Sequence, residues 1–166
     1  MTLSLRDVME HVLAMPPGSL VYLDRRTGAL RLVTEEITEA AGREVDMSSR
    51  PDWERELIQI ARLDEASERY VPLPALLELD EYETVGQLLE EVKDVPLRDR
   101  LFSATHGTDG LLRFTAIAKA SGLGDRWDAL RRAALADLLR ERLGERGIPF
   151  DDDVDEGELR AGADGR

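Results

Sequence analysis

The chain of 166 residues contains no cysteine. This absence excludes disulfide bonds, thiolate catalysis, and zinc or iron–sulfur sites built on cysteine. No apolar run approaches the roughly 18 residues that a membrane-spanning helix needs. The first residues, MTLSLRDVMEH, mix both charge signs without a long apolar stretch, so they do not resemble a secretory signal. These absences predict a cytoplasmic protein with no membrane partner.

Lysine, histidine and aromatic residues are scarce: the chain has two lysines, two histidines and 5% aromatic residues. Arginine supplies most of the 22 basic side chains, which face 35 acidic ones and leave a net charge of −13. Such a field repels phosphate backbones and anionic lipid. The charge is uneven, however, because residues 111–146 carry a net +3 and residues 1–110 a net −11. The basic segment could be a local binding site or could pair with acidic parts of the same chain.

Length and pattern predict one α+β domain over residues 1–150, followed by an acidic, glycine-containing tail at 151–166 that we expect to be disordered. The domain is expected to combine a small antiparallel sheet, made of an N-terminal hairpin and a short third strand, with a mainly helical C-terminal half. At this length the chain can bury a core without a metal or disulfide.

The N-terminal half shows one helix and then strands. Residues 4–15 place apolar side chains on one helical face, with Ser4 as the N-cap and Asp7 three residues later. Residues 19–24 and 29–34 read as a hairpin, in which Leu30 and Leu32 are expected on the buried face.

The middle of the chain is less clear. Residues 51–63 predict a helix with Trp53, Leu57 and Ile60 on one side, although residues 56–60 also fit a strand. Residues 70–73 predict a third strand, and Pro72 places it at an edge.

The C-terminal half predicts helices. A stripe that includes Tyr82, Val85 and Leu88 begins near residue 81, and a second helix begins at Pro96. Residues 109–146 then form two amphipathic helices joined by a tight turn at residues 122–124.

Several pieces, in this order and spacing, resemble UPF0158, a bacterial family of uncharacterised function. The resemblance spans about residues 19–143 and rests on residues 21–24 with Thr27-Gly28, 51–53, 70–74, 80–82, 112–114, and Gly122-Leu123 followed by Trp127 and Arg131. Asp109, Leu112 and Asp128 depart from the expected family pattern. Asp109 puts in doubt any anion site in the segment 107–114. The resemblance implies no activity.

The sequence offers little for catalysis or metal binding. Ser103 and His106 are spaced to meet on one helix, but nothing supplies the strained turn and oxyanion hole of a hydrolase triad. Asp151 begins an EF-hand-like run, yet Glu156 replaces the turn glycine and Gly162 the bidentate glutamate. We therefore predict no catalytic residue, no metal site and no cofactor.

Residues 117–123 also resemble the first helix and turn of a helix-turn-helix. A recognition helix would then bury apolar residues where this chain has Asp128 and Arg131. An ordinary helical hairpin with glycine in its turn explains the same pattern, and we favour it.

Arg131 falls within the apolar arc that Trp127, Leu130 and Leu138 define on the last helix. A charged group in such an arc must be paired or must reach out to solvent. Two interpretations stay open: a structural ion pair with a distant carboxylate, which we favour, or an anion site beside Trp127.

These observations favour a non-enzymatic protein–protein interaction or regulatory module with an unknown protein partner. The alternative is a nucleic-acid-associated protein that uses the basic residues 111–146; an enzyme of unknown class is third. The oligomeric state stays open. The candidate binding residues share an aromatic or arginine side chain with the composition of an interface anchor: Trp53, Arg113, Phe114, Trp127 and Arg131.

Overall fold

The structure, a computed structural model, describes residues 2–16, 18–63, 67–74, 79–155 and 157. Helices predominate over short strands in these ranges, which confirms the predicted α+β class. Contacts divide the chain into two compact units. The first unit comprises Met1–Glu78 and Leu138–Asp153, and the second comprises Leu79–Asp137 and Val154–Arg166. The single domain expected over residues 1–150 stays a prediction.

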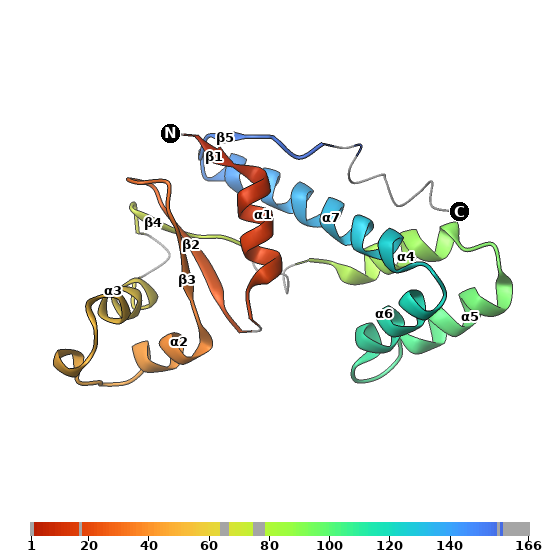
Figure 1. Cartoon of the computed structure of the whole chain (residues 1–166), viewed down its shortest axis with the longest axis horizontal. Coiled ribbons are helices and arrows are strands. Elements are labelled where there is room, and N and C mark those ends of the chain that lie inside the picture. Colours follow the sequence, from red (N-terminus) through yellow and green to blue (C-terminus); the bar gives the residue numbers. More distant parts are fainter. Residues whose placement is uncertain (1, 17, 64–66, 75–78, 156, 158–166) are drawn as a thin grey trace. The chain divides into compact units, whose positions relative to one another are not determined.

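Figure 1 labels the helices and strands along the chain. In chain order they are β1 (Leu3–Ser4), α1 (Leu5–Ala14), β2 (Leu20–Asp24), β3 (Leu30–Val33), α2 (Glu35–Ala41), the 3-10 turn η1 (Met47–Ser49), α3 (Asp52–Ala61), β4 (Tyr70–Pro72), α4 (Glu81–Glu91), α5 (Val95–Ala104), α6 (Gly110–Ala120), α7 (Gly124–Glu145) and β5 (Phe150–Asp151).

The first unit contains a three-stranded antiparallel sheet in the order β3–β2–β4. Strands β2 and β3 form the predicted hairpin, in which Val21 lies opposite Leu32. Strand β4 pairs with the other side of β2 and places Pro72 opposite Tyr22. Pro72 therefore lies on an edge strand, as expected for a residue that has no backbone N–H to donate.

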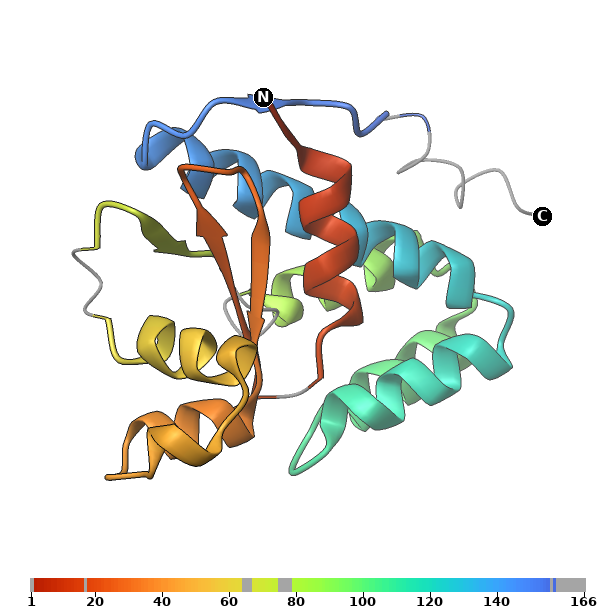
Figure 2. The ribbon, with the colours of Figure 1, turned by 60° about the vertical axis from the view of Figure 1, so that its left-hand side comes forward.

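Helices lie on both sides of this sheet. Figures 1 and 2 show α1 on one side of the hairpin and α2 with α3 on the other. On the side of α3, Val33 packs with Ile37 and Ile58. The prediction that Leu32 belongs to the buried face is therefore wrong: Val33 is fully buried, whereas Leu32 is 39% exposed. A sheet covered on both faces buries residues of either parity, so alternation alone does not identify one buried face.

Helix α1 begins at its predicted N-cap. The Ser4 hydroxyl accepts a hydrogen bond from the Asp7 backbone N–H at 3.1 Å. Asp153 adds a second set of contacts at the same helix end, because its carboxylate accepts from the Ser4 hydroxyl at 2.5 Å and from the Arg6 backbone N–H at 2.8 Å. Two side chains thus satisfy N–H groups that the first turn of a helix leaves without helical partners.

The boundary expected at residue 151 needs correction. Strand β5 pairs in parallel with β1, with Phe150 opposite Leu3, and Asp152 pairs with Arg140 at 2.8 Å. Together with Asp153, these residues take part in the fold of the first unit. Residues 156 and 158–166 of the predicted tail lie outside the described residues.

Residues 56–60, compatible with helix or strand in the sequence, form part of the helix α3. Its first turn carries Asp52 and Glu54 near the positive end of the helix. The buried positions are Ile58 and Ile60, while Trp53 points outward with 63% of its surface exposed. The prediction that Trp53 belongs to the apolar side of this helix was therefore wrong.

The second unit is built from α4, α5, α6 and the first part of α7. Gly110 approaches Thr105 so closely that a Cβ would overlap the Thr105 carbonyl. The turn predicted between α6 and α7 is present, and Gly122 there has a φ of 78°. Tyr82, expected in the buried stripe of α4, is exposed instead. The core of this unit is Val85, Leu88, Val92, Leu101, Phe114, Ala118, Trp127 and Leu130.

Candidate functional site

Phe114 and Trp127, two of the five candidate binding residues, are core residues of the second unit. Their exposed fractions are 0% and 1%. The rings meet edge to face with centroids 4.8 Å apart, and the indole N–H of Trp127 donates to the Thr115 hydroxyl at 3.1 Å. A buried aromatic pair with its polar atom satisfied stabilises the fold. Neither side chain offers a surface to a partner.

Arg131 forms an ion pair within the second unit. Its Nε and Nη2 atoms donate to Oε1 of Glu81 at 3.0 and 2.7 Å. The guanidinium also lies 5.7 Å from the centre of the Trp127 ring. Glu81 is therefore the distant carboxylate that the prediction of a structural ion pair requires. Because Arg131 is paired in this way, the alternative of an anion site beside Trp127 has no support.

Arg113 is exposed but engaged within its own unit. Its Nη1 donates to the backbone oxygen of Thr108 at 2.7 Å, and its Nη2 donates to the backbone oxygen of His106. These bonds tie the α5–α6 loop to α6. The loop also contains Asp109, whose φ of 60° is unusual for a residue other than glycine. The position of Arg113 therefore has a structural explanation.

Trp53 is the one candidate whose aromatic ring stays open to solvent. It lies on α3 in the first unit, whereas the other four candidates belong to the second unit. The five residues thus do not form one site. An indole that is 63% exposed leaves a large apolar surface uncovered.

Trp53 lines a pocket of about 480 Å³ between α2 and α3, which we call the α2–α3 pocket. Arg62 holds the two helices together at one end, because its guanidinium donates to the backbone oxygens of Ala41 at 3.1 Å and Arg43 at 3.0 Å. The residues that line the pocket are Thr34, Glu36, Ile37, Glu39, Ala40, Arg43, Val45, Arg50, Trp53, Glu54 and Leu57.

The charged groups of the α2–α3 pocket are largely paired with one another. Arg43 contacts Glu39 at 3.1 Å, and Arg50 contacts Glu54 at 2.5 Å. Glu36 has no ion pair among the described residues, so the lining carries one excess negative charge. Ile37, Val45, Trp53 and Leu57 add apolar side chains to this charged lining. A surface that combines aromatic and apolar side chains with paired charges has the composition of a protein contact surface.

The one catalytic arrangement considered in the sequence is not assembled. The His106 ring nitrogen Nδ1 lies 3.3 Å from the backbone oxygen of Ser103, not from its hydroxyl, and the ring packs edge to face on Phe102. Among the described residues there is also no group of three or more histidine, aspartate or glutamate side chains placed to hold a metal.

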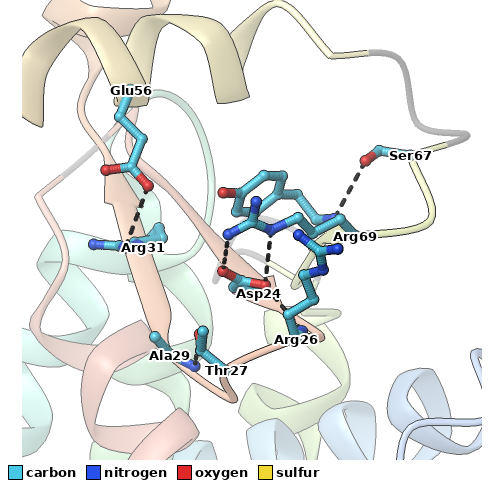
Figure 3. Close-up of polar contacts among 9 residues, drawn as sticks. Asp24, Arg26, Thr27, Ala29, Arg31, Glu56, Ser67 and Arg69 are labelled. Carbon is cyan, nitrogen blue, oxygen red and sulfur yellow. Dashed lines mark hydrogen bonds and ion pairs between the residues drawn. The ribbon is translucent and has the colours of Figure 1, made fainter.

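Asp24, at the end of β2, anchors a polar cluster that Figure 3 shows. The carboxylate is fully buried and accepts two bonds from Arg69, Nε to Oδ1 at 3.2 Å and Nη2 to Oδ2 at 2.9 Å. Its Oδ1 also accepts from the Arg26 backbone N–H at 2.9 Å. The Arg69 hydrogen bonds are the main reason that the pKa of Asp24 falls from 3.8 to about 2.

Sequence reasoning missed both the α2–α3 pocket and the partner of Asp24. The residues of the pocket come from two helices and the loop between them, and no spacing in the sequence marks a groove. Arg69 lies 45 positions from Asp24. The only available signal was Asp24 itself, an acidic residue at the end of a strand that leads into a turn.

Comparison with protein-family profiles, characterised proteins and solved structures finds no significant match. The resemblance to UPF0158 therefore stays a prediction. No helix among the described residues is long and apolar enough to cross a membrane.

Proposed function

We propose that this chain is a cytoplasmic, non-enzymatic protein–protein interaction module whose α2–α3 pocket receives part of a partner protein. The observation that carries the proposal is Trp53, an indole at the edge of the pocket with 63% of its surface exposed. Tryptophan is enriched among the residues that contribute most to protein interfaces.

The energy available at Trp53 is sufficient for an interface anchor. Covering this ring would remove roughly 120 Å² of mainly apolar surface from water, worth about 2–3 kcal/mol at about 25 cal/mol per Å². That range matches the effect of a residue that dominates an interface, about 2 kcal/mol or more on truncation.

Charge indicates the chemistry of the partner. Glu36 in the pocket lining, which has no ion pair with the described residues, and the net charge of −13 favour a segment that combines an apolar side chain with basic residues. A lysine or arginine of that segment could lie over the exposed face of Trp53, where cation–π attraction contributes about 0.5–1 kcal/mol.

The alternative, association with nucleic acid through residues 111–146, has less support. Arg126 contacts Glu91 at 2.5 Å, Arg131 contacts Glu81 at 2.7 Å, and Arg113 donates to backbone oxygens. Cations that are already paired neutralise few phosphates, which is what affinity for a duplex requires.

The experiment uses tagged protein as bait in an extract of its native cell, followed by quantitative mass spectrometry. Three baits are compared: the unchanged chain, Trp53→Ala, and Tyr82→Ala as a matched control with an aromatic ring 62% exposed in the second unit. We expect a protein that the unchanged chain and Tyr82→Ala capture equally and that Trp53→Ala loses. Equal capture by all three baits would refute the proposal.

A further inference from the structure

The loop between β2 and β3 brings together arginines from distant parts of the chain. Arg25 and Arg26 are consecutive in this loop, and the backbone N–H of Arg25 donates to the backbone oxygen of Arg69 at 2.8 Å. Arg25 also donates from Nη2 to the backbone oxygen of Arg146, at the end of α7, at 2.6 Å. Four arginines of the first unit thus lie around one turn.

Among the described residues, the carboxylate that is hydrogen-bonded within this turn is that of Asp24, and both of its oxygens are already occupied. Asp24 is fully buried, and it accepts from Arg69 with both oxygens and from the Arg26 backbone N–H. The acidic side chain next to Arg69 in sequence, Glu68, makes no ion pair with the described residues. Arg25, Arg26 and Arg69 outnumber Asp24 and Glu68, so these five residues carry a net charge of +1 within a chain of net charge −13.

The Arg26 guanidinium is the available group of the cluster. The side chain is exposed, and it makes no hydrogen bond or ion pair with the part of the chain that the structure describes. In Figure 3 it extends toward Arg69, and no dashed line leaves its guanidinium. Like charges brought near each other cost free energy unless an anion lies between them or beside them.

We propose that Arg26 and the outer edge of Arg69 bind the phosphate group of a small molecule. A guanidinium presents its N–H groups in a planar fork that matches two oxygens of a phosphate, and two such forks can hold one phosphate from two sides. Asp24 positions this site without occupying it, because it fixes Arg69 from the buried side and leaves the rest of the guanidinium to solvent.

Arg69 and the backbone of the loop that carries Arg26 are held in place before any ligand arrives. Arg69 is fixed by its two bonds to Asp24 and by stacking over the Tyr70 ring, 4.8 Å from its centre. The loop is closed by bonds from the Gly28 backbone N–H to the Asp24 backbone oxygen at 2.8 Å and from the Ala29 N–H to the Thr27 hydroxyl at 3.2 Å. Groups that are already ordered cost little entropy on binding.

The proposal does not depend on the α2–α3 pocket. It also differs from the anion site considered at Arg131, which uses its fork on Glu81. The distinction between the two arginines is that Arg131 donates to a carboxylate of its own unit, whereas Arg26 does not donate from its side chain to any described residue.

The test is calorimetric titration of the full chain with inorganic phosphate and with phenyl phosphate, each at an ionic strength held constant with sodium chloride. Binding of either probe supports the site, and the tighter of the two indicates whether the ligand is a free or an organic phosphate. Arg26→Ala should weaken binding about tenfold or more, the equivalent of one charge-assisted contact.

Arg55→Ala is the control, because it removes one half-buried arginine of the same unit on α3, which pairs with Asp52 outside this loop. It should leave phosphate affinity unchanged, and Arg26→Ala should leave the thermal midpoint without phosphate unchanged, since its side chain contacts no described residue. Absence of binding in the unchanged chain, or equal binding by Arg26→Ala, would overturn the proposal.

Discussion

Asp24→Asn should lower the stability of the first unit at pH 7. It should also make the loss of stability at acid pH smaller. The Asp24 carboxylate is fully buried, and Arg69 is its charged partner. An amide can still accept from the Arg26 backbone N–H, but it loses the charge that holds both bonds from Arg69. We expect a loss of about 1.5–3 kcal/mol at pH 7, the range for a hydrogen-bonded charge.

The direction of the pH effect follows from the pKa. The folded chain holds the Asp24 pKa at about 2, below the ordinary 3.8, chiefly through the Arg69 hydrogen bonds. The unfolded chain therefore binds a proton at higher pH than the folded chain does. The stabilisation is fully present above about pH 4 and is lost as the pH falls from about 4 to about 2.

The size of the pH effect is smaller than the pKa shift alone suggests. At about 1.36 kcal/mol per pH unit, the change from 3.8 to about 2 corresponds to roughly 2.4 kcal/mol. The Arg69 side chain is 42% exposed, and solvent screens its interaction. We therefore expect about 1–2 kcal/mol.

The assay is urea unfolding at pH 7, 4, 3 and 2, followed by circular dichroism. The fall in unfolding free energy between pH 4 and pH 2 should be about 1–2 kcal/mol smaller in Asp24→Asn than in the unchanged chain. Asp99→Asn, an exposed aspartate of α5, controls for loss of one carboxylate. An equal fall in the unchanged chain and Asp24→Asn would refute the assignment of this buried ion pair.

Two further predictions concern the core and the C-terminal segment. Trp127→Ala should cost about 3–5 kcal/mol in the unfolding free energy of the second unit, because it removes a buried ring and leaves the Thr115 hydroxyl without its donor. A loss below about 1 kcal/mol in urea unfolding would contradict the burial of this ring. Asp153→Ala should cost about 0.5–2 kcal/mol, since it removes one of the two acceptors at the start of α1. A thermal midpoint unchanged from that of the parent chain would show that Asp153 does not contribute there.

Sequence reasoning was most successful where the cause of a structure is local. The Ser4 N-cap, the hairpin and the turn at Gly122 each depend on residues only a few positions apart, and all three are present. A capping hydroxyl or a glycine with positive φ acts on its immediate neighbours, so its signal can be read from a short segment.

Contacts between distant residues could not be predicted in the same way. Glu81 lies 50 positions from Arg131, and Asp153 lies 149 positions from Ser4. An ion pair was expected for Arg131, but no local pattern identified its partner. The acidic composition of the segment around Asp153 predicted a disordered tail. Nothing in that composition indicated that Asp153 accepts hydrogen bonds at the start of α1.

The two tryptophans show the same limit for the candidate site. Each stands in an amphipathic helix among apolar and charged residues, so the sequence assigned both to an apolar face. The fold covers Trp127 with its own unit and leaves Trp53 at the edge of the α2–α3 pocket. Burial depends on which helix packs opposite, and this information is absent from the spacing of one segment.

The central claim, that Trp53 anchors a partner protein, is tested most directly by the equilibrium affinity of the captured partner for purified variants. Trp53→Ala should raise the dissociation constant about thirtyfold or more, which corresponds to about 2 kcal/mol of binding free energy. Tyr82→Ala should leave the dissociation constant unchanged. The three proteins should have equal circular dichroism spectra, so that a change reports binding and not folding. A dissociation constant for Trp53→Ala within about twofold of that of the unchanged chain would contradict the account.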